Sequence, residues 1–317
     1  MSVLEQIKEL ILNAAKILII THENPDGDAI GSSLGFMNGL VKLGKDVEVA
    51  VPAINEMYSF LPGFELLKKE INPEDYDLCI ALDSSDLDRL GTLRTAFEKI
   101  EKTIVIDHHI TNQNFGDVNY VNAVASSTCQ NIIVILATLD VAINKDIATC
   151  IYTGILTDTG GFRYNVQSET FEFAGMLLET GIDIAKIYKI LFDTTTEART
   201  RLLGRALNTL EILADGKIAF SYVTAKDFEE LGNQDGDQEG IVNYGRDIEG
   251  VEVSIFVREK DGMRKVSLRS NEYLNVSLIA SKYSGGGHVK AAGFETSKTI
   301  EEIKEELVVE IKRQLQQ

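Results

Sequence analysis

The chain has 317 residues, of which 44% are hydrophobic and 25% are charged, and its formal net charge is −18. This length is sufficient for two domains, each with its own core. The composition is typical of a soluble globular protein, and no apolar run approaches the roughly 20 residues of a membrane span. The acidic charge argues against extended binding along duplex DNA or RNA, because it repels phosphates.

The N-terminal sequence MSVLEQIKEL is amphipathic and acidic, so it lacks the basic start and unbroken apolar segment of a signal peptide. Three cysteines, Cys79, Cys129 and Cys150, have no paired spacing and stand beside aliphatic residues. We expect buried free thiols, as in a reducing compartment. The predicted location is therefore the cytoplasm, without a membrane partner.

The first half alternates short β-branched segments with helical patterns. Strands are predicted at KILIIT (16–21), DVEVAVP (46–52), DLCIALD (77–83) and KTIVID (102–107), with helices near 30–43 and 88–100. This alternation favours a parallel sheet covered by helices on both faces. A mostly helical pattern follows over residues 126–192. Its apolar stretch at 132–139 suits either a core or the interface of a homodimer.

A second unit follows the polar stretch DTTTEART (193–200) and the helical pattern RLLGRALNTLEIL (201–213). Strands are predicted at KIAFSYV, GVEVSIFVRE and MRKVSLRS, before a helix from about Asn275, a glycine-rich stretch and a closing helix. We therefore predict an α/β chain in three parts: a parallel-sheet domain over 1–192, a linker with a connecting helix over 193–214, and a smaller mixed-sheet α/β domain over 215–317.

Acidic and histidine side chains gather where the predicted strands of the first half end. They are His22, Asp26 and Asp28 after the first strand, Asp83 after the third, and Asp107, His108 and His109 after the fourth, with Asp158 ahead of a glycine turn. Parallel strands end at one edge of a sheet, where ligands of open α/β proteins bind. Turn and helix-capping chemistry also explains any one of these groups alone. Their combination favours a binding site.

The residue types in this group favour divalent metal ions. Histidine and carboxylate ligands without cysteine suit Mn²⁺ or Mg²⁺ better than structural zinc. Four carboxylates repel one another at short range unless cations cancel their charge, which two divalent ions do. Two metals about 3.5–4 Å apart can clamp the attacking and leaving oxygens of a phosphate. We therefore expect two divalent cations in a phosphate-hydrolysing site.

The fourth histidine of the chain, His288, follows Gly285, Gly286 and Gly287. Glycines let the backbone approach a phosphate closely, and an imidazole can donate to it. A plain tight turn beside an incidental histidine is the alternative interpretation. We predict that these four residues bind substrate.

A local excess of basic residues surrounds Arg269, in the sequence SLRSN. Residues 258–290 contain seven Lys and Arg against three Asp and Glu. A guanidinium binds phosphate through two hydrogen bonds, so Arg269 and its neighbour Ser270 are predicted to bind a substrate phosphate. A solvated strand face is the alternative explanation for Lys260, Arg264 and Lys265.

With these residues assembled, the chain resembles the DHH phosphoesterase superfamily. The signature Asp-His-His stands at residues 107–109, and the first motif, His-x-x-Pro-Asp-x-Asp-x-x-Gly-Ser, stands at residues 22–32. The aspartates of the second and fourth motifs are Asp83 and Asp158. The sequence GGGH, followed by AAG at 291–293, resembles the DHH-associated C-terminal domain. These motifs cover nearly the whole chain.

The resemblance implies a role for each matching residue. One metal would be held by His22, Asp26 and Asp83, and the other by Asp28, Asp83, His108 and Asp158. Asp107 would orient the neighbouring imidazoles. His109 would face the substrate phosphate and either neutralise its charge or protonate the leaving oxygen.

Within the superfamily, the chain is similar to the nano-RNase and pAp phosphatase group, where pAp is 3′-phosphoadenosine-5′-phosphate. The resemblance implies Mn²⁺-dependent hydrolysis of short oligoribonucleotides and linear dinucleotides such as pApA to 5′-mononucleotides, by a hydroxide that bridges two metals. Removal of the 3′-phosphate of pAp is also implied. Cyclic di-AMP phosphodiesterase activity is the first alternative. The GGGH sequence argues against an inorganic pyrophosphatase, and the complete ligand set argues against a catalytically silent nucleotide sensor.

Overall fold

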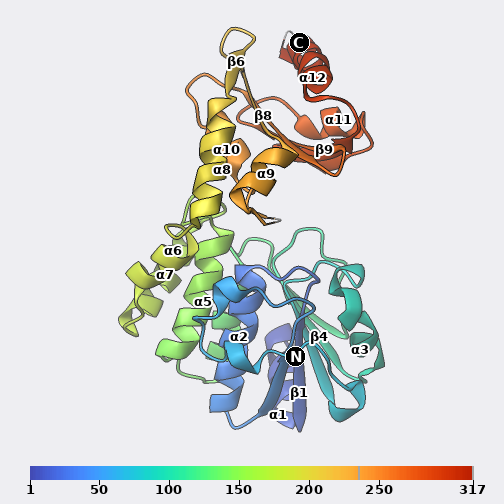
Figure 1. Cartoon of the computed structure of the whole chain (residues 1–317). Helices are drawn as coiled ribbons and strands as arrows, with labels where there is room; N and C mark the ends of the chain where they lie inside the picture. Colours follow the sequence, from blue (N-terminus) through green and yellow to red (C-terminus); the bar gives the residue numbers. More distant parts are fainter. Residues whose placement is uncertain (235, 316–317) are drawn as a thin grey trace. The chain divides into compact units, whose positions relative to one another are not determined.

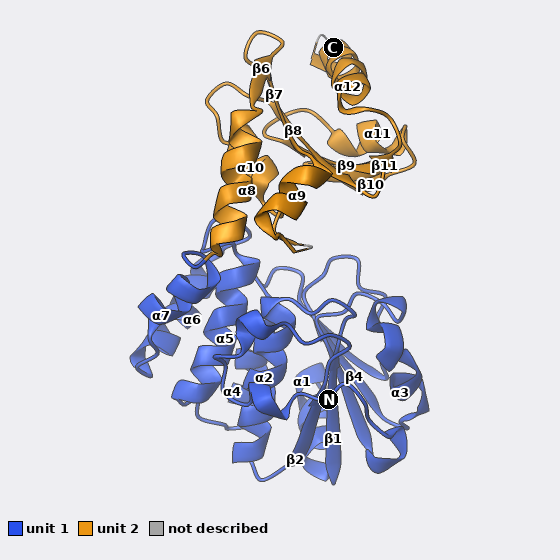
Figure 2. Ribbon diagram, viewed as in Figure 1, with its two compact units in different colours: residues 1–194 blue, residues 195–317 orange. Residues whose placement is uncertain are grey.

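The computed structural model describes residues 1–234 and 236–315 of the chain. The chain divides into two compact units, Met1–Thr194 and Thr195–Gln317, which are coloured separately in Figure 2. Each unit contains its own sheet and its own buried apolar core. Within the described residues, no helix combines the length and the apolar composition that crossing a bilayer requires.

The sheet of the first unit has five parallel strands in the order β2-β1-β3-β4-β5. The strands are β1 (Lys16–Thr21), β2 (Asp46–Ala50), β3 (Leu78–Leu82), β4 (Thr103–Asp107) and β5 (Val118–Val121). The first four agree with the sequence prediction. The sequence does not predict β5, because its residues VNYV are few and only partly buried, so no apolar pattern marks them.

Helices cover both faces of this sheet, as predicted (Figure 1). One face packs against α1 (Val3–Asn13), α2 (Gly27–Lys42), α4 (Thr128–Thr138) and α5 (Lys145–Asp158). The other face packs against the 3-10 helix η4 (Asp88–Leu93) and α3 (Arg94–Lys99). The remaining helices of the unit are α6 (Ser168–Glu179), α7 (Ile184–Leu191), η1 (Glu56–Tyr58), η2 (Phe64–Leu66) and η3 (Pro73–Asp75).

Strand β1 explains why the sheet is covered on both faces. Ile17 and Ile19 are buried in the cluster that includes α1 and α2, whereas Leu18 and Ile20 are buried in the cluster that includes α3. Successive side chains of a strand point to opposite faces, so an unbroken apolar run requires cover on both.

Two further sequence predictions concern the core of this unit. Cys79, Cys129 and Cys150 are free and buried, which confirms the predicted thiols. The apolar stretch at 132–139 suits a core or an interface from its sequence. In the structure it belongs to the core, with Ile132 and Leu136 fully buried.

The second unit contains a six-stranded sheet in the order β10-β11-β9-β8-β7-β6. The strands are β6 (Glu211–Leu213), β7 (Ile218–Val223), β8 (Val253–Lys260), β9 (Met263–Ser270), β10 (Gly286–His288) and β11 (Ala291–Thr296). Strands β7 and β8 are parallel, and the other neighbouring pairs are antiparallel. The sheet is therefore mixed, as predicted.

The two faces of the second sheet are covered unequally. One face packs against α11 (Val276–Ser281) and α12 (Ile300–Leu315). On the other face, α8 (Glu197–Asn208), α9 (Ala225–Leu231) and α10 (Ile241–Arg246) pack around Phe256 of β8. The residues of β9, β10 and β11 on this second face are half-buried or exposed. We call this part of the second sheet the open face.

Two segments of the second unit differ from the sequence prediction. The helical pattern over 201–213 ends at Asn208, and Glu211–Leu213 forms strand β6. Between them, the hydroxyl of Thr209 donates to the carbonyl of Tyr222 and accepts its N–H, which ties the chain to β7 and ends the helix. The glycine-rich stretch is not an isolated turn, because β10 and β11 pair with each other within it.

Candidate active site

Adjacent strands of the first sheet end in register at one edge. Thr21 of β1 pairs with Leu82 of β3, so the residues that follow them, His22 and Asp83, lie side by side. Asp107 ends β4, the next strand of the sheet. The connections after β1 and β3 leave to opposite faces, through α2 and η4. Such a switch point is where open α/β sheets bind ligands.

Asp83 lies at the centre of this edge. It is 2% exposed and has a φ of 58°, in the left-handed region that costs a non-glycine residue energy. Its N–H donates to the carbonyl of Ile106 over 3.1 Å, and the hydroxyl of Thr128 donates to its Oδ1 over 3.0 Å. His22 Nε2 lies 3.6 Å from its Oδ2. These contacts hold the carboxylate in one orientation.

Asp26 and Asp28 are held by two different helix N-termini. Asp26 is the N-cap of α2, and its Oδ1 accepts the N–H groups of Asp28 and Ala29. Asp28 is 1% exposed, and its two oxygens accept the N–H groups of Thr128 and Cys129 over 2.6 and 2.9 Å. Those N–H groups begin α4, where the helix dipole favours negative charge. Both carboxylates therefore have fixed positions.

Helix α2 approaches α5 closely, which brings Asp158 to the same group. A Cβ on Gly31 of α2 would lie 2.5 Å from the carbonyl oxygen of Cys150 in α5, so this contact requires glycine. Asp158 is the last residue of α5, and its Oδ2 lies 3.6 Å from His108 Nε2. Asp28 Oδ2 lies 3.9 Å from the same nitrogen. His108 therefore joins carboxylates from two helices.

Asp107, His108 and His109 are each held differently. Asp107 is fully buried, its Oδ1 lies 2.7 Å from His109 Nδ1, and Asn112 Nδ2 donates to its other oxygen over 2.6 Å. His108 Nδ1 faces the carbonyl oxygen of Ala125 at 3.4 Å. The prediction that Asp107 orients both neighbouring imidazoles therefore needs a correction. Its carboxylate contacts the imidazole of His109, whereas the imidazole of His108 faces a backbone carbonyl.

Gathering these carboxylates changes their pKa values. Burial, with the charges of Asp83 and Asp158, raises the pKa of Asp28 well above its ordinary value. The pKa of Asp158 rises to about 6, chiefly through burial. Burial would also raise the pKa of Asp83, but its three histidine neighbours outweigh burial and lower it. In the free protein, each carboxylate that ionises therefore makes the next one harder to ionise.

Among the described residues, three groups of donor atoms are close enough to hold cations. Within each group the atoms lie within 4.8 Å of one another; the groups are His22, Asp26 and Asp83; Asp28, His108 and Asp158; and Asp83, His108 and His109. The first two groups contain the six residues predicted as metal ligands from the sequence, and we call these six the acid cluster. The third group adds His109, which is predicted to face the substrate. Imidazole and carboxylate donors fit Mn²⁺ or Mg²⁺.

In the second unit, Arg269 and His288 lie on the open face. Arg269 of β9 pairs with Ala291 of β11, and Ala291 pairs with His288 of β10, so the three share one face of the sheet. Burial and the charge of Arg246 lower the pKa of Arg269. Within the described residues, no carboxylate forms an ion pair with it. His288 is exposed.

Ser270 faces the opposite way from Arg269, as neighbours on a strand do. It is 4% exposed, and its hydroxyl donates to the carbonyl of Leu274 over 2.7 Å. Ser267, two residues before Arg269, lies on the open face, and the two residues line one hollow there. Ser270 therefore does not share the open face with Arg269, contrary to the prediction that the two side chains lie together.

The three glycines before His288 differ in what requires them. A Cβ on Gly285 would lie 2.3 Å from a backbone oxygen of β11, and one on Gly287 would lie 2.4 Å from another. Packing against β11 therefore explains both. A Cβ on Gly286 would meet nothing within 4 Å. The fold does not require glycine there, which leaves the surface beside His288 open.

Comparison with known proteins identifies both units. Residues 16–155 match the family model described as "DHH family, N-terminal domain", and residues 215–317 match the "DHHA1 domain". The bifunctional oligoribonuclease and PAP phosphatase NrnA of Thermus thermophilus is 38% identical over 282 residues, which cover 87% of this chain and 83% of that protein. The chain belongs to the DHH phosphoesterase family.

Two further relatives show how much of this chain, and of each relative, the similarity covers. A crystal structure of an exopolyphosphatase-related protein from Bacteroides fragilis is 31% identical, with a TM-score of 0.89, and the match covers 99% of this chain and 98% of that one. The cyclic-di-AMP phosphodiesterase PdeA of Listeria monocytogenes is 26% identical, over 96% of this chain and 48% of that protein. As a DHH family member, the chain is a metal-dependent phosphoesterase.

The DHH motifs include the acid cluster but not all of the residues that hold it. Thr128 contacts both Asp83 and Asp28, and Asn131 Nδ2 donates to the carbonyl of Asp107 over 3.0 Å. The sequence indicates only that the polar stretch before α4 begins a helix. Its contacts with carboxylates about 100 and 45 positions away in the chain depend on the fold.

Proposed function

We propose that this DHH protein is a Mn²⁺-dependent phosphodiesterase that hydrolyses short oligoribonucleotides and linear dinucleotides such as pApA to 5′-mononucleotides. Removal of the 3′-phosphate of pAp at the same site is part of the proposal. The observation that carries it is the convergence of histidines and carboxylates around Asp83, at the switch point of the first sheet. The name of the Thermus relative, an oligoribonuclease and PAP phosphatase, supports the substrate class.

In this proposal the acid cluster would hold two cations. His22, Asp26 and Asp83 would supply the ligands of one, and Asp28, Asp83, His108 and Asp158 would supply those of the other. Such a pair of ions supplies an activated water and neutralises charge on the phosphate oxygens. The raised pKa of Asp28 and that of Asp158 support cation binding, because a cation makes these carboxylates easier to ionise. The donor set favours Mn²⁺, with Mg²⁺ as the alternative.

His109 is the residue that we assign to the substrate phosphate. Its side chain is 32% exposed, compared with 6% for His22 and 14% for His108. The carboxylate of Asp107 against its Nδ1 raises its pKa. A protonated imidazole can neutralise the phosphate or give its proton to the departing 3′-oxygen. Asp107 acts as a positioning residue, because it works through His109.

Within the second unit, we assign nucleotide binding to the open face. Arg269 offers a guanidinium without a carboxylate partner among the described residues, and His288 offers a nearby exposed imidazole. The space left by Gly286 lets a ligand approach the backbone of β10. We add Ser267 to this surface, with Gly285 and Gly287 shaping it through their packing against β11. Ser270 is left out, because its hydroxyl donates inward.

Cyclic di-AMP is the second candidate substrate. The likeness to PdeA, a cyclic-di-AMP phosphodiesterase that is about twice the length of the matched region, favours it. Both substrates present a phosphodiester to the same acid cluster. They differ in the free terminal phosphate that pApA carries and that Arg269 could bind.

A substrate panel with Mn²⁺ tests the proposal directly. The purified protein is incubated with pApA, pAp, cyclic di-AMP, a 24-mer RNA and pyrophosphate, and the products are separated by chromatography. We expect AMP from pApA and from pAp, with slower turnover of the 24-mer. Phosphate release from pyrophosphate alone would overturn the proposal. Turnover of cyclic di-AMP well above that of pApA would favour the second candidate.

A further inference from the structure

The loops that follow β3 and β4 are hydrogen-bonded to each other. Asn112 Nδ2 donates to the carbonyl oxygen of Ser84 over 3.0 Å, and the N–H of Gln113 donates to that of Ser85 over 2.9 Å. Ser84 directly follows Asp83, whose backbone is in the left-handed region. The side chain of Asn112 therefore reaches from the loop after β4 to the residue beside Asp83.

The amide of Asn112 has one orientation that satisfies its surroundings. Its Nδ2 carries two hydrogens, one for the carbonyl of Ser84 and one for Asp107 Oδ2, which lies 2.6 Å away. Its Oδ1 accepts the N–H of Asn114 over 2.7 Å. Exchanging the oxygen and the nitrogen would place an acceptor against two acceptors and a donor against a donor. The half-buried amide is therefore locked with a donor toward Asp107.

Asp107 depends on two side chains for its hydrogen bonds. The residue is fully buried, its Oδ2 accepts from Asn112, and its Oδ1 lies 2.7 Å from His109 Nδ1. Among the described residues, no other side chain forms a hydrogen bond or an ion pair with this carboxylate. An unpaired oxygen on a buried carboxylate is costly, so the group turns toward any donor within reach. The Asn112 donor therefore holds Oδ2 and leaves Oδ1 for His109.

His109 is the member of this series that reaches solvent. Because Asp107 engages its Nδ1, Nε2 is the nitrogen left for a substrate. Its ring packs edge-on against that of His108, with 4.8 Å between the ring centroids. Asn112, Asp107 and His109 thus form a continuous series of contacts from a loop to a partly exposed imidazole. Imidazoles that act on a substrate are held through such a series in several classes of enzyme.

We propose that Asn112 is a positioning residue for the hydrolysis: it holds the carboxylate of Asp107, and Asp107 in turn holds the imidazole of His109 against the substrate phosphate. This inference rests on the proposed function, because it extends the contacts behind His109. The contact with Ser84 serves to orient the amide. The competing explanation is that Asn112 acts through Ser84 on Asp83 and its cations. The two explanations differ in what the loss of Asn112 should change.

A double-mutant cycle separates them. Asn112→Ala and His109→Ala are made singly and together, and kcat and KM are measured with Mn²⁺ on the substrate of the panel that the wild type turns over fastest. The Mn²⁺ affinity of each protein is measured by titration calorimetry. Gln113→Ala is the matched control. Gln113 is exposed, its side chain forms no hydrogen bond among the described residues, and the substitution keeps its backbone N–H to Ser85.

We expect Asn112→Ala to lower kcat about 10- to 100-fold with little change in KM, the usual loss when a group that orients a functional side chain is removed. In the His109→Ala background, the same substitution should lower kcat less than about threefold further, because the imidazole that it positions is gone. Mn²⁺ affinity should stay within about twofold of the wild type, because within the described part of the chain the Asn112 side chain forms no hydrogen bond with the acid cluster. Gln113→Ala should behave like the wild type.

Four results would overturn the inference. An equal loss of kcat from Asn112→Ala in both backgrounds would indicate a packing role, and a loss of Mn²⁺ affinity as large as the loss of kcat would indicate a role through Asp83. An unchanged kcat would remove the role altogether, and an equal loss in Gln113→Ala would assign the effect to the loop as a whole. If Asn112→Ala lost the far-ultraviolet circular dichroism of the wild type, Asn112→Ser would replace it in the cycle under the same criteria.

Failure of the proposed function is a separate observation, the absence of AMP from pApA and pAp in the substrate panel. The cycle uses whichever phosphodiester the wild type hydrolyses, so it does not depend on that result. Non-additive losses on cyclic di-AMP would support the role of Asn112 while favouring the second candidate substrate. Additive losses on pApA would overturn the role of Asn112 and leave the proposed function intact.

Discussion

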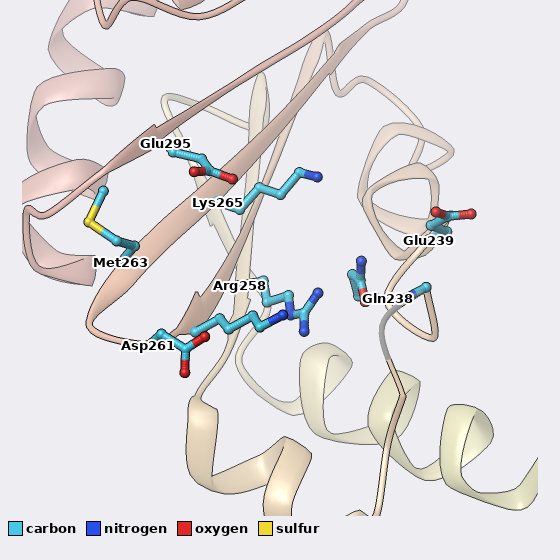
Figure 3. A pocket seen from close by; sticks show the side chains of 9 residues that line it. Gln238, Glu239, Arg258, Asp261, Met263, Lys265 and Glu295 are labelled. Atoms are coloured by element: carbon cyan, nitrogen blue, oxygen red, sulfur yellow. Dashed lines mark hydrogen bonds between the residues drawn. The ribbon is translucent and has the colours of Figure 1, made fainter. Parts of the chain in front are cut away.

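The acid cluster of the first unit and two basic residues on the open face of the second, Lys265 and Arg269 of β9, which we call the cation row, both gather like charges, but in different surroundings. Asp28 and Asp83 are 1% and 2% exposed, and backbone N–H groups and the hydroxyl of Thr128 hold their oxygens. In the cation row, Lys265, which Figure 3 shows, is exposed and Arg269 is half-buried. Repulsion between like charges is strong where solvent is excluded and weak where water and salt screen it.

This difference indicates which kind of partner each group suits. A cluster whose central carboxylates, Asp28 and Asp83, are buried and hydrogen-bonded fixes the positions of its ligand atoms and therefore suits resident cations. An open row fixes charge only loosely and suits a ligand that binds and leaves. Removal of one charge should consequently have a large effect in the acid cluster and a small one in the cation row.

The largest effect is expected from Asp83→Asn. Asparagine keeps the shape of the side chain but removes the charge that both proposed cations share. We expect phosphodiesterase activity to fall about 10³-fold or more, because the cations contribute several kcal/mol to the transition state. The number of Mn²⁺ ions retained after desalting, measured by elemental analysis, should also fall. Far-ultraviolet circular dichroism should remain that of the wild type.

Glu23→Gln is the matched control for Asp83→Asn. Glu23 is exposed, lies in the loop after β1 and stands outside the acid cluster, yet its substitution removes the same charge. It should retain near-normal activity and metal content. If Asp83→Asn kept both, the shared-ligand model would be wrong. If both variants lost activity equally, the loss would reflect net charge and not the geometry of the cluster.

A smaller effect is expected from Thr128→Val, which removes the hydroxyl that donates to Asp83 Oδ1 over 3.0 Å. The N–H group that donates to Asp28 remains. Groups that orient metal ligands typically contribute 10- to 100-fold to metal affinity or activity, so we expect a loss of about that size. Mn²⁺ affinity measured by titration calorimetry separates this role from simple packing, because valine keeps the volume of threonine.

Thr128→Ser completes this test. Serine keeps the hydroxyl and loses one methyl group, so it should recover most of the Mn²⁺ affinity that Thr128→Val loses. If serine and valine were equally impaired, the methyl packing of this fully buried residue would explain the effect. The proposed role of Thr128 in orienting Asp83 would then be abandoned.

Thr128 also marks the limit of what the sequence predicts. The strands β1, β3 and β4 carry apolar residues at successive positions, and the polar residues that end them follow directly, so the edge and the convergence of its histidines and carboxylates are predictable from sequence alone. Which residues form hydrogen bonds to these carboxylates depends on how α4 and α5 approach α2. Close packing at Gly31 decides that approach, and no local pattern states which helix packs there.

Ser270 and Ser267 give a second, different lesson. Arg269 is on the open face, so the alternation of a strand places Ser270 on the opposite face and Ser267 on the same one. That information was present in the sequence once β9 was recognised as a strand. By contrast, β5 and β6 are too short for alternation to identify, and tertiary pairing alone defines them.

The smallest effect is expected from pH, and it measures the repulsion inside the acid cluster. In the metal-free folded protein the pKa of Asp158 is about 6, above its ordinary value of 3.8. Between these values the folded state binds more protons than the unfolded state, so stability falls as the pH rises through about 6. His109, whose pKa is also raised, acts in the same direction. We expect the free energy of unfolding in EDTA, measured with urea, to fall on the order of 1–2 kcal/mol between pH 5 and pH 8.

Added Mn²⁺ should reverse this dependence, because its ligands must be deprotonated to bind it. It should stabilise the protein strongly at pH 8 and weakly at pH 5. Asp158→Asn removes one titrating group and should flatten the metal-free profile, whereas Lys265→Met should leave the profile unchanged, because Lys265 lies outside the acid cluster. A flat metal-free profile in the wild type would mean that the buried carboxylates do not strain the fold. The carboxylates of the acid cluster would then repel one another as weakly as the exposed charges of the cation row do. Burial would no longer explain why the acid cluster suits bound metal ions and the cation row suits a ligand that binds and leaves.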